Sequence, residues 1–219
     1  DVLWSPIEWF RSPGLLQALL PTLYFGQSML ATNAAYPSAK ILEMLQRYRV
    51  TSVCVPAETL EAISQLPSVL SPSSPLILRS LVTIDKNIPE AVADWSRQTL
   101  NATPNETFGT REVGQILGNS HLKWPIRAGS LGKAYPGHRI ALLSETGVPV
   151  KTGETGEIAL NRFDQHGHAD PALLNAFWRQ PELATHAFNG DWFRSGLFAS
   201  MDEQGYYWPQ ERPVESRPE

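Results

Sequence analysis

Between Gly129 and Leu160 the chain reads GSLGKAYPGHRIALLSETGVPVKTGETGEIAL. The short apolar runs HRIALLS and GEIAL are separated by glycine turns, at Thr146-Gly147 and between Gly153 and Gly156. Glycine readily adopts the positive φ that many tight turns need, and short strands joined by such turns are typical of antiparallel sheets. The stretch therefore predicts a β-rich region.

Toward the N-terminus the pattern changes to alternating helix and strand signals. Leucines at helical spacing precede the strand-like run SMLAT, and a helix that starts at Pro37-Ser38 precedes the β-branched run from Val50 to Val55. Two further helix starts, at Thr59 and Pro89, flank the buried-strand candidate LRSLVTI. The helix after Pro37 is expected to bury Ile41, Leu42, Leu45 and Tyr48. Such alternation predicts a parallel sheet covered by helices.

Downstream of Leu160 the sequence predicts one more helix and a final pair of strands. The helix is expected near Pro181, and the strands FRSGLFASM and YYWP are joined by a turn from Asp202 to Gly205. We expect an α/β part at residues 1–126 and a β-rich subdomain at residues 127–219. The predicted fold class is α/β, with a partial parallel sheet and flanking helices followed by an antiparallel β-rich subdomain.

The composition of the chain indicates which binding partners and which cellular compartment we expect. A chain with 42% hydrophobic and 18% charged residues is typical of a globular protein, so disorder is not expected. The net charge of −4 argues against nucleic acid and anionic membranes, and no apolar run approaches the roughly 20 residues of a membrane span. The single cysteine, Cys54, lies in the apolar run TSVCV, which indicates a reduced thiol and a cytoplasmic location.

Four separated stretches resemble the AMP-forming acyl-CoA synthetases, and in particular the medium-chain enzymes of this adenylate-forming family. The run from Gly129 to Leu160 is similar to the family's GS-G-P-PG and PPG-GE pattern, and ETFGTREVG from Glu106 to Gly114 is similar to its E-G-Y-G-x-T-E loop. The run GDWFRSGLFASMDEQGYYW is similar to W-(F/Y)-x-T-G-D followed by D-x-D-G-Y, and Arg212 then matches the arginine of G-R. The opening DVLWSPIEWFRSPG also resembles the segment after the family's phosphate loop, so the likeness covers nearly the whole chain.

The resemblance implies a reaction, its ligands and a set of site residues. A carboxylic acid attacks the α-phosphate of ATP to give an acyl-adenylate, and coenzyme A then displaces AMP. By this resemblance Glu112 is the catalytic carboxylate and the magnesium ligand. The implied nucleotide-binding residues are Phe108, Gly109, Thr110, Arg111 and Arg212.

Several positions depart from the family's pattern, and all of them concern the nucleotide. Arg111 stands where the family has a phosphate-contacting threonine, Leu197 replaces the ribose-binding aspartate of T-G-D, and Asp85-Lys86-Asn87 replaces Gly-Glu-Pro. The phosphate loop would precede Asp1, and the adenylation lysine would follow Arg212 in a C-terminal domain. Losing hydrogen bonds to a charged group costs about 1.5 to 3 kcal/mol, so we expect weakened ATP, AMP and magnesium binding.

Two hypotheses from different classes follow. The chain is the central part of an acid-CoA ligase that is inactive on its own, or it is a degenerate homologue that serves as an interaction or small-molecule-binding module. Under either hypothesis we expect a homo-oligomer or a complementary chain to cover apolar surface that would otherwise be exposed.

Other chemistry-bearing residues have plainer interpretations. His166 and His168 lie two residues apart with no third ligand nearby, which argues against a metal site. Tyr206, Tyr207 and Trp208 are expected to pack in a core strand rather than against adenine, and Ser195 has no His and Asp pattern of a hydrolase nucleophile.

Overall fold

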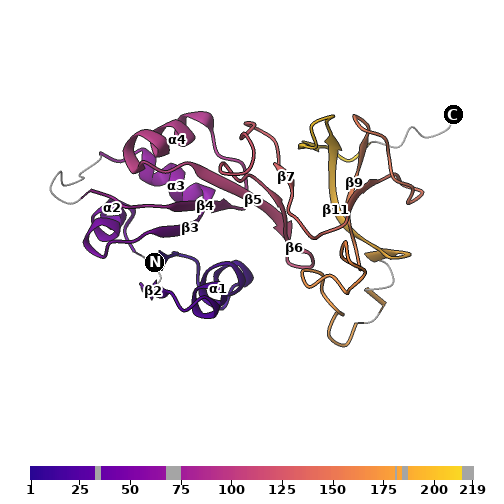
Figure 1. Cartoon of the computed structure of the whole chain (residues 1–219), viewed down its shortest axis with the longest axis horizontal. Coiled ribbons are helices and arrows are strands. Elements are labelled where there is room, and N and C mark those ends of the chain that lie inside the picture. Colours follow the sequence, from indigo (N-terminus) through magenta and orange to yellow (C-terminus); the bar gives the residue numbers. More distant parts are fainter. Residues whose placement is uncertain (33–35, 68–74, 181, 184–186, 214–219) are drawn as a thin grey trace. The chain divides into compact units, whose positions relative to one another are not determined.

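The computed structural model describes residues 1–32, 36–67, 75–180, 182–183 and 187–213. It consists of two compact units, residues 1–106 with 121–123, and residues 107–120 with 124–219 (Figure 1). The first unit carries the helices and parallel strands, and the second carries the antiparallel strands. This arrangement confirms the predicted fold class.

The first unit is built on a parallel sheet with the order β2-β1-β3-β4-β5. Its strands are β1 (Val2–Trp4), β2 (Ser28–Leu30), β3 (Ser52–Pro56), β4 (Ser80–Ile84) and the start of β5 (Pro104–Thr110). Its helices are the π-helix η1 (Gly14–Leu19), α1 (Leu20–Tyr24), α2 (Ser38–Arg47), α3 (Ala57–Ser64), α4 (Glu90–Trp95) and the π-helix η2 (Ser96–Leu100). Each predicted alternation of helix and strand is therefore present.

Helix α2 shows why the local sequence folds as it does. Pro37 precedes its first residue in an extended conformation, and Ile41, Leu42 and Leu45 fall on one face and are buried. Full burial of each such side chain stabilises the fold by about 1.5 to 3 kcal/mol. Tyr48 was predicted on the same face, but it follows the last helical turn and is 49% exposed, so that prediction is wrong.

The core of the first unit joins α2, α3, α4 and η2 to strands β1, β3 and β4. Its largest fully buried members are Trp4, Met44, Leu60 and Leu81. No residue of η1 or α1 belongs to this core cluster. Figure 1 shows α1 on one side of the strands and α3 and α4 on the other.

The second unit contains the end of β5 and two antiparallel groups of strands. Strand β5 pairs with β6 (Gly114–Gly118), which pairs with β7 (Lys133–Ala134). The other group has the order β10-β11-β9-β8, with β12 paired to β11. Its strands are β8 (Ile140–Leu143), β9 (Thr155–Asn161), β10 (Phe188–Asn189), β11 (Trp192–Met201) and β12 (Tyr207–Gln210).

The stretch from Gly129 to Leu160 forms turns and strands as predicted. Gly132 has φ +80 and approaches β6 so closely that a Cβ there would lie 2.0 Å from the carbonyl oxygen of Gly118. The predicted turn after β11 is also present, because the Asp202 carboxylate accepts hydrogen bonds from the N–H groups of Gln204 and Tyr206. Both features fix the path of strands that pack in one core around Ile158 and Leu160.

Two predictions about organisation remain open. The compact units change over between residues 106 and 107, ahead of the change in sequence character at Arg127, and the division into 1–126 and 127–219 stays a prediction. The helix predicted near Pro181 falls largely on residues 181 and 184–186, outside the described residues. Within the described ranges no helix is both long and apolar enough to cross a membrane.

Candidate functional site

The segment from Glu106 to Gly114 forms a tight hairpin between β5 and β6. The register shifts between Phe108 and Gly109, and a Cβ on Gly109 would lie 1.6 Å from the carbonyl oxygen of Gly114. A side chain at position 109 would therefore force the two strands apart. The Thr110 hydroxyl accepts a 3.3 Å hydrogen bond from the N–H of Glu112, which shapes the turn.

A neighbouring loop holds this hairpin from outside. The Leu174 N–H donates a 2.7 Å hydrogen bond to the carbonyl of Glu112. The loop is anchored by the buried Asp170, whose carboxylate contacts His138 Nδ1 at 2.8 Å and accepts a hydrogen bond from the N–H of Ala172. The position of Glu112 therefore depends on residues far from it in sequence.

The side chains of the hairpin differ in their surroundings. Phe108 packs against the core of the second unit, and Arg111 is exposed. Glu112 is partly buried, and among the described residues its carboxylate has neither a hydrogen bond nor an ion pair, so Arg111 does not neutralise it. A partly buried carboxylate without a partner is available to a cation.

The second element of the site is a bulge in β11 at Ser195, Gly196 and Leu197. Strands β9 and β11 pair in register up to Arg194 and again from Phe198, and Gly196 has φ +77 between them. The Ser195 hydroxyl donates to the carbonyl of Ile158 at 2.7 Å and accepts from the N–H of Leu197 at 3.2 Å. These bonds commit the hydroxyl to the backbone, which agrees with the prediction that Ser195 is not a nucleophile.

Glu157 holds the bulge in place. One oxygen of its carboxylate accepts a 2.7 Å hydrogen bond from the N–H of Gly196, and the other contacts Arg194 Nε at 2.6 Å and a terminal nitrogen at 2.5 Å. The Glu157 side chain is 9% exposed and that of Arg194 is 24% exposed. A charge pair this close and this shielded from water fixes geometry far better than a pair on the surface.

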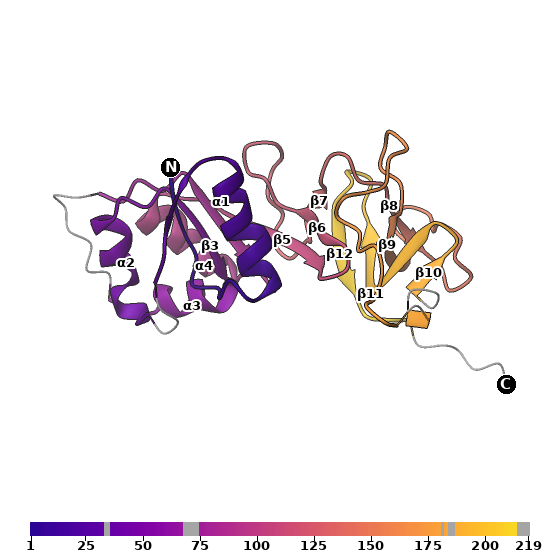
Figure 2. The same ribbon diagram turned by 90° about the horizontal axis from the view of Figure 1, so that it is seen from below.

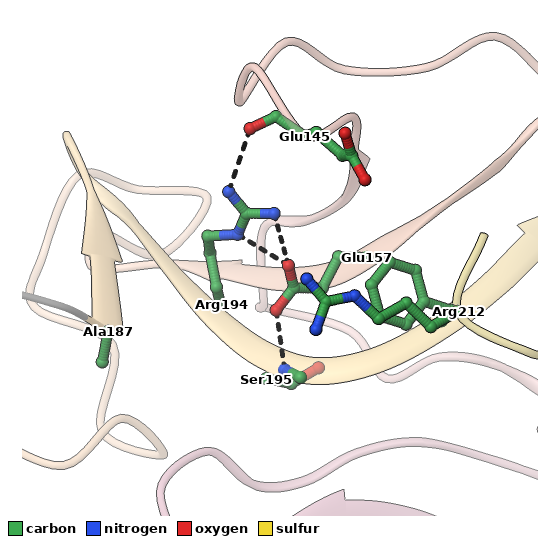
Figure 3. A pocket seen from close by; sticks show the side chains of 8 residues that line it. Glu145, Glu157, Ala187, Arg194, Ser195 and Arg212 are labelled. Atoms are coloured by element: carbon green, nitrogen blue, oxygen red, sulfur yellow. Dashed lines mark hydrogen bonds and ion pairs between the residues drawn. The ribbon is translucent and has the colours of Figure 1, made fainter. Parts of the chain in front are cut away.

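A pocket of about 550 Å³ opens beside this ion pair (Figure 3). Arg194 directs its guanidinium to Glu157 and also to the backbone carbonyl of Glu145 at 3.3 Å. Arg212 reaches the same pocket from the segment after β12, and its guanidinium lies 6.0 Å from the Phe198 ring centroid. In the described part of the chain Arg212 has no acidic partner, so its charge is available to an anion.

Leu197 lies on the bulge but does not line the pocket. Its side chain is 38% exposed and cannot accept a hydrogen bond. The conformation of the bulge rests on Ser195, Gly196 and Glu157 and makes no use of the residue 197 side chain. The backbone around position 197 is therefore held in place without any contribution from the side chain at that position.

In the first unit, the stretch Asp85-Lys86-Asn87 forms a turn after β4. Asp85 has φ +80, a conformation that favours glycine, and burial together with the charge of Glu58 raises the pKa of its carboxyl. Lys86 lies 3.3 Å from Glu61 and 3.9 Å from Glu58. The Lys86 ammonium is therefore directed to two carboxylates of α3, and both ion pairs lie within the first unit.

The remaining candidates are two histidines, the cysteine and two tyrosines. His166 and His168 donate their N–H groups to Asp164, and within the described ranges no group of three or more His, Cys, Asp or Glu side chains is placed to hold a metal. Burial, with a smaller effect of the Asp85 charge, raises the pKa of Cys54 to about 12, so its thiol stays protonated. Tyr206 and Tyr207 are buried, as predicted.

Five of the six predicted site residues are consecutive in the sequence, and the structure separates them from the sixth. Phe108, Gly109, Thr110, Arg111 and Glu112 share the hairpin, whereas Arg212 lies at the pocket on the other strand group. Sequence reasoning missed Glu157 and Arg194 as the pair that shapes the bulge. The available signal was an acidic residue inside the apolar run GEIAL, because a carboxylate buried in a strand requires a partner.

These features match a known family. The model of the AMP-binding enzyme family matches residues 1–162, which include the hairpin, Glu157 and the first four strands of the parallel sheet. The chain belongs to this family. Its relatives among curated proteins are acyl-CoA ligases, so the resemblance inferred from the motifs is confirmed.

Individual relatives show how much of the family's length is matched. An uncharacterized acyl-CoA ligase of Bacillus subtilis, YtcI, is 27% identical over 97% of this chain, and the match covers 39% of YtcI. Indoleacetate-CoA ligase of Aromatoleum aromaticum is 32% identical over 98% of the chain and 40% of its own length. The chain thus spans about two fifths of the length of these relatives.

Solved structures show the same fold. An acyl-CoA synthetase of Brucella canis superimposes on 97% of this chain with a TM-score of 0.82 and 22% identity, and 38% of that structure is covered. ATP-bound MatB of Rhodopseudomonas palustris gives a TM-score of 0.82 and 22% identity over 97% of this chain. The fold predicted for this chain, that of adenylate-forming enzymes, is therefore present.

Proposed function

We propose that this chain is the central part of an AMP-forming acid-CoA ligase and is inactive when isolated. In this proposal it contributes to the binding of ATP and a carboxylic acid, and coenzyme A accepts the acyl group to form a thioester. The observation that carries the proposal is the unpaired Glu112 carboxylate on a hairpin whose backbone is tightly fixed, in a chain of the AMP-binding family. Relatives that include benzoate-CoA ligase support the acid-thiol ligase class.

Glu112 suits magnesium, because this ion prefers oxygen ligands and is held in proteins by one or two carboxylates with substrate phosphates and water. Magnesium would supply charge neutralisation for the phosphates. The Leu174 N–H holds the backbone of Glu112, so the turn that carries this carboxylate is fixed within the chain itself. Gly109 lets the strands approach, and Thr110 shapes the turn.

Arg212 would supply a second contact to the nucleotide. Its guanidinium has no acidic partner in the described residues and lies at the pocket beside the bulge. Arg194, in contrast, is committed to Glu157 and serves to hold the bulge. Arg111 is exposed next to Glu112 and would give a phosphate a cation where the family has a hydroxyl.

The experiment is a pyrophosphate-release assay with ATP, magnesium, a panel of fatty and aromatic acids, and coenzyme A. We expect no release from the chain alone. Release is expected when the chain replaces the matched segment in the indoleacetate-CoA ligase of Aromatoleum aromaticum, and it should be lost in the Glu112→Gln version of that chimera. A folded chimera that is silent with every acid would contradict the ligase proposal.

A second candidate is favoured by Leu197 and by the turn at Asp85, both at positions where the family contacts the nucleotide. In it, the chain is a degenerate homologue that binds a partner or a small molecule without chemistry. Calorimetry separates the two candidates, because the degenerate homologue binds neither AMP nor ATP, and magnesium-dependent AMP binding would exclude it. We further propose a reducing, cytoplasmic location, which the free and buried Cys54 thiol supports.

A further inference from the structure

The loop at residues 170–174 lies against the hairpin that carries Glu112, and we call it the Asp170 loop. The Leu174 N–H donates a 2.7 Å hydrogen bond to the carbonyl oxygen of Glu112. Two residues further along the hairpin, a Cβ on Gly114 would lie 3.5 Å from that of Ala172, which is ordinary van der Waals contact. The loop therefore contacts the hairpin both by a hydrogen bond and by packing.

The fold brings Asp170 beside His138, although the two residues are 32 positions apart in the sequence. His138 comes shortly before the start of β8, and the chain that leads to Asp170 leaves from the end of β9. These two strands are antiparallel neighbours (Figure 2). The Asp170 N–H then donates a 2.9 Å hydrogen bond to the carbonyl of Arg162, directly after β9. The pairing of β8 with β9 therefore sets the distance between Asp170 and His138.

The Asp170 carboxylate is buried and has a partner for each of its oxygens. Its side chain is 0% exposed. One oxygen lies 2.8 Å from His138 Nδ1, and the other accepts a 2.9 Å hydrogen bond from the N–H of Ala172. Burying a carboxylate costs free energy unless its oxygens are bonded, so the folded chain strongly favours keeping both contacts. Asp170 is therefore a fixed point at the start of the loop.

The short backbone between Asp170 and Leu174 carries this position to the hairpin. The first residue after Asp170 is a proline, whose ring restricts the backbone, and the Leu173 N–H donates to the carbonyl of Asp170 at 3.2 Å. Leu173 and Leu174 also pack against the core of the second unit. Apolar packing has no preferred direction, whereas the charged contact of Asp170 has one. The contacts of Asp170 therefore direct the Leu174 N–H to the carbonyl of Glu112.

We propose that Asp170, together with His138, is a positioning residue for Glu112. By holding the Asp170 loop on the hairpin, the pair sets the place of the turn that carries the magnesium carboxylate. The inference rests on the proposed function, because it concerns Glu112 as a magnesium ligand. Removing a residue that orients a metal ligand through hydrogen bonds typically lowers metal affinity by about 10- to 100-fold. The pair acts through the backbone of the hairpin and touches neither nucleotide nor metal.

Amide hydrogen exchange of the ligand-free chain, followed by NMR, measures whether Asp170 holds the loop. Asp170→Ala should speed the exchange of the Leu174 N–H by about tenfold or more relative to the amides of β9, because the loop would open locally. His138→Leu removes the same contact from its other side, at a side chain that is 17% exposed, and should act in the same direction even if Asp170→Ala fails to fold. Asp170→Asn keeps an oxygen for the Ala172 N–H and should preserve most of the protection.

Magnesium titration of the same variants at millimolar AMP, followed at the Glu112 amide, measures the effect on the proposed ligand. Asp170→Ala and His138→Leu should raise the magnesium dissociation constant by about 10- to 100-fold, and Asp170→Asn should return it to within about threefold of the wild type. The matched control is Asp202→Asn. Asp202 also accepts two backbone N–H groups and pairs with Arg127, and its partners in the described part of the chain lie outside the hairpin. This control should lower stability and leave magnesium affinity unchanged.

The outcomes separate the positioning role from the proposed function. Faster Leu174 exchange with weaker magnesium binding in the Asp170→Ala and His138→Leu chains, but not in the control, would support the positioning role. Unchanged Leu174 protection, wild-type magnesium affinity in these chains, or an equal loss in the control would overturn it and leave Glu112 as the ligand. A wild-type chain in which magnesium and AMP leave the Glu112 amide unchanged would contradict the proposed function itself, and the positioning role would fall with it.

Discussion

Restoring a carboxylate at position 197 should strengthen nucleotide binding. The bulge of β11 is held by Glu157, which binds the Gly196 N–H at 2.7 Å, and by Ser195, which binds the carbonyl of Ile158 at 2.7 Å. Neither contact involves the side chain of Leu197. In Leu197→Asp, a new carboxylate would therefore occupy a position that is already shaped by other residues.

The magnitude follows from the strength of charged hydrogen bonds. A carboxylate that accepts hydrogen bonds from the ribose hydroxyls contributes about 1.5 to 3 kcal/mol, or roughly 10- to 150-fold in affinity. Leu197 is 38% exposed, so its replacement should cost little folding stability. A neutral acceptor contributes about 0.5 to 1.5 kcal/mol, so the control Leu197→Asn should gain about tenfold at most.

The assay is calorimetric titration with AMP in the presence of magnesium, for the wild type, Leu197→Asp and Leu197→Asn. We expect the dissociation constant to fall in the order wild type, Asn variant, Asp variant. An Asp variant that is folded by circular dichroism and binds AMP no better than the wild type would refute the expectation, drawn from the family resemblance, that a carboxylate at position 197 binds the ribose.

Three further predictions concern stability. Glu157→Gln should lower the free energy of unfolding by about 1.5 to 3 kcal/mol in urea titration, because Arg194 loses its charged partner and keeps only the Glu145 carbonyl; a loss below about 0.5 kcal/mol would contradict the role given to this pair. Gly109→Ala should cost more than about 3 kcal/mol and broaden the amide spectrum of the hairpin, because the new methyl group would meet the Gly114 carbonyl at 1.6 Å; an unchanged melting temperature would argue against this geometry. Burial tends to raise the pKa of Asp202, but hydrogen bonds from an indole and two backbone N–H groups, with a nearby guanidinium, hold that pKa below its ordinary value. The carboxylate therefore adds stability above pH about 4 that is lost as the pH falls through the lowered folded pKa, and Asp202→Asn should make the acid side of the stability profile shallower; an identical profile would count against it.

Much of the fold could be predicted because its determinants are local. The apolar spacing of Ile41, Leu42 and Leu45, the β-branched run at β3 and the glycine turns near Gly147 and Gly153 each indicate their own element. The motif ETFGTREVG was likened only to a loop of the family, so the hairpin itself was not predicted, although Gly109 permits the close approach that its strands require.

What the sequence did not predict depends on contacts between distant residues. The pairing of Glu157 with Arg194 requires β9 and β11 to lie side by side, and the bond from Leu174 to Glu112 requires a loop to return to the hairpin. The orientation of η1 and α1 was also not predicted, because leucines at helical spacing indicate a helix without indicating which side faces the core. Tyr48 was misplaced because the helix ends just before it.

We expect the hairpin at residues 106–114 and the bulge at residues 195–197 each to contact the nucleotide. The most direct measurement is backbone amide chemical-shift mapping of the wild-type chain, titrated with AMP and magnesium to millimolar concentration. We predict shifts that concentrate at Thr110 to Gly114 and at Ser195 to Leu197. Shifts confined to other parts of the chain, or no shifts at all, would contradict it.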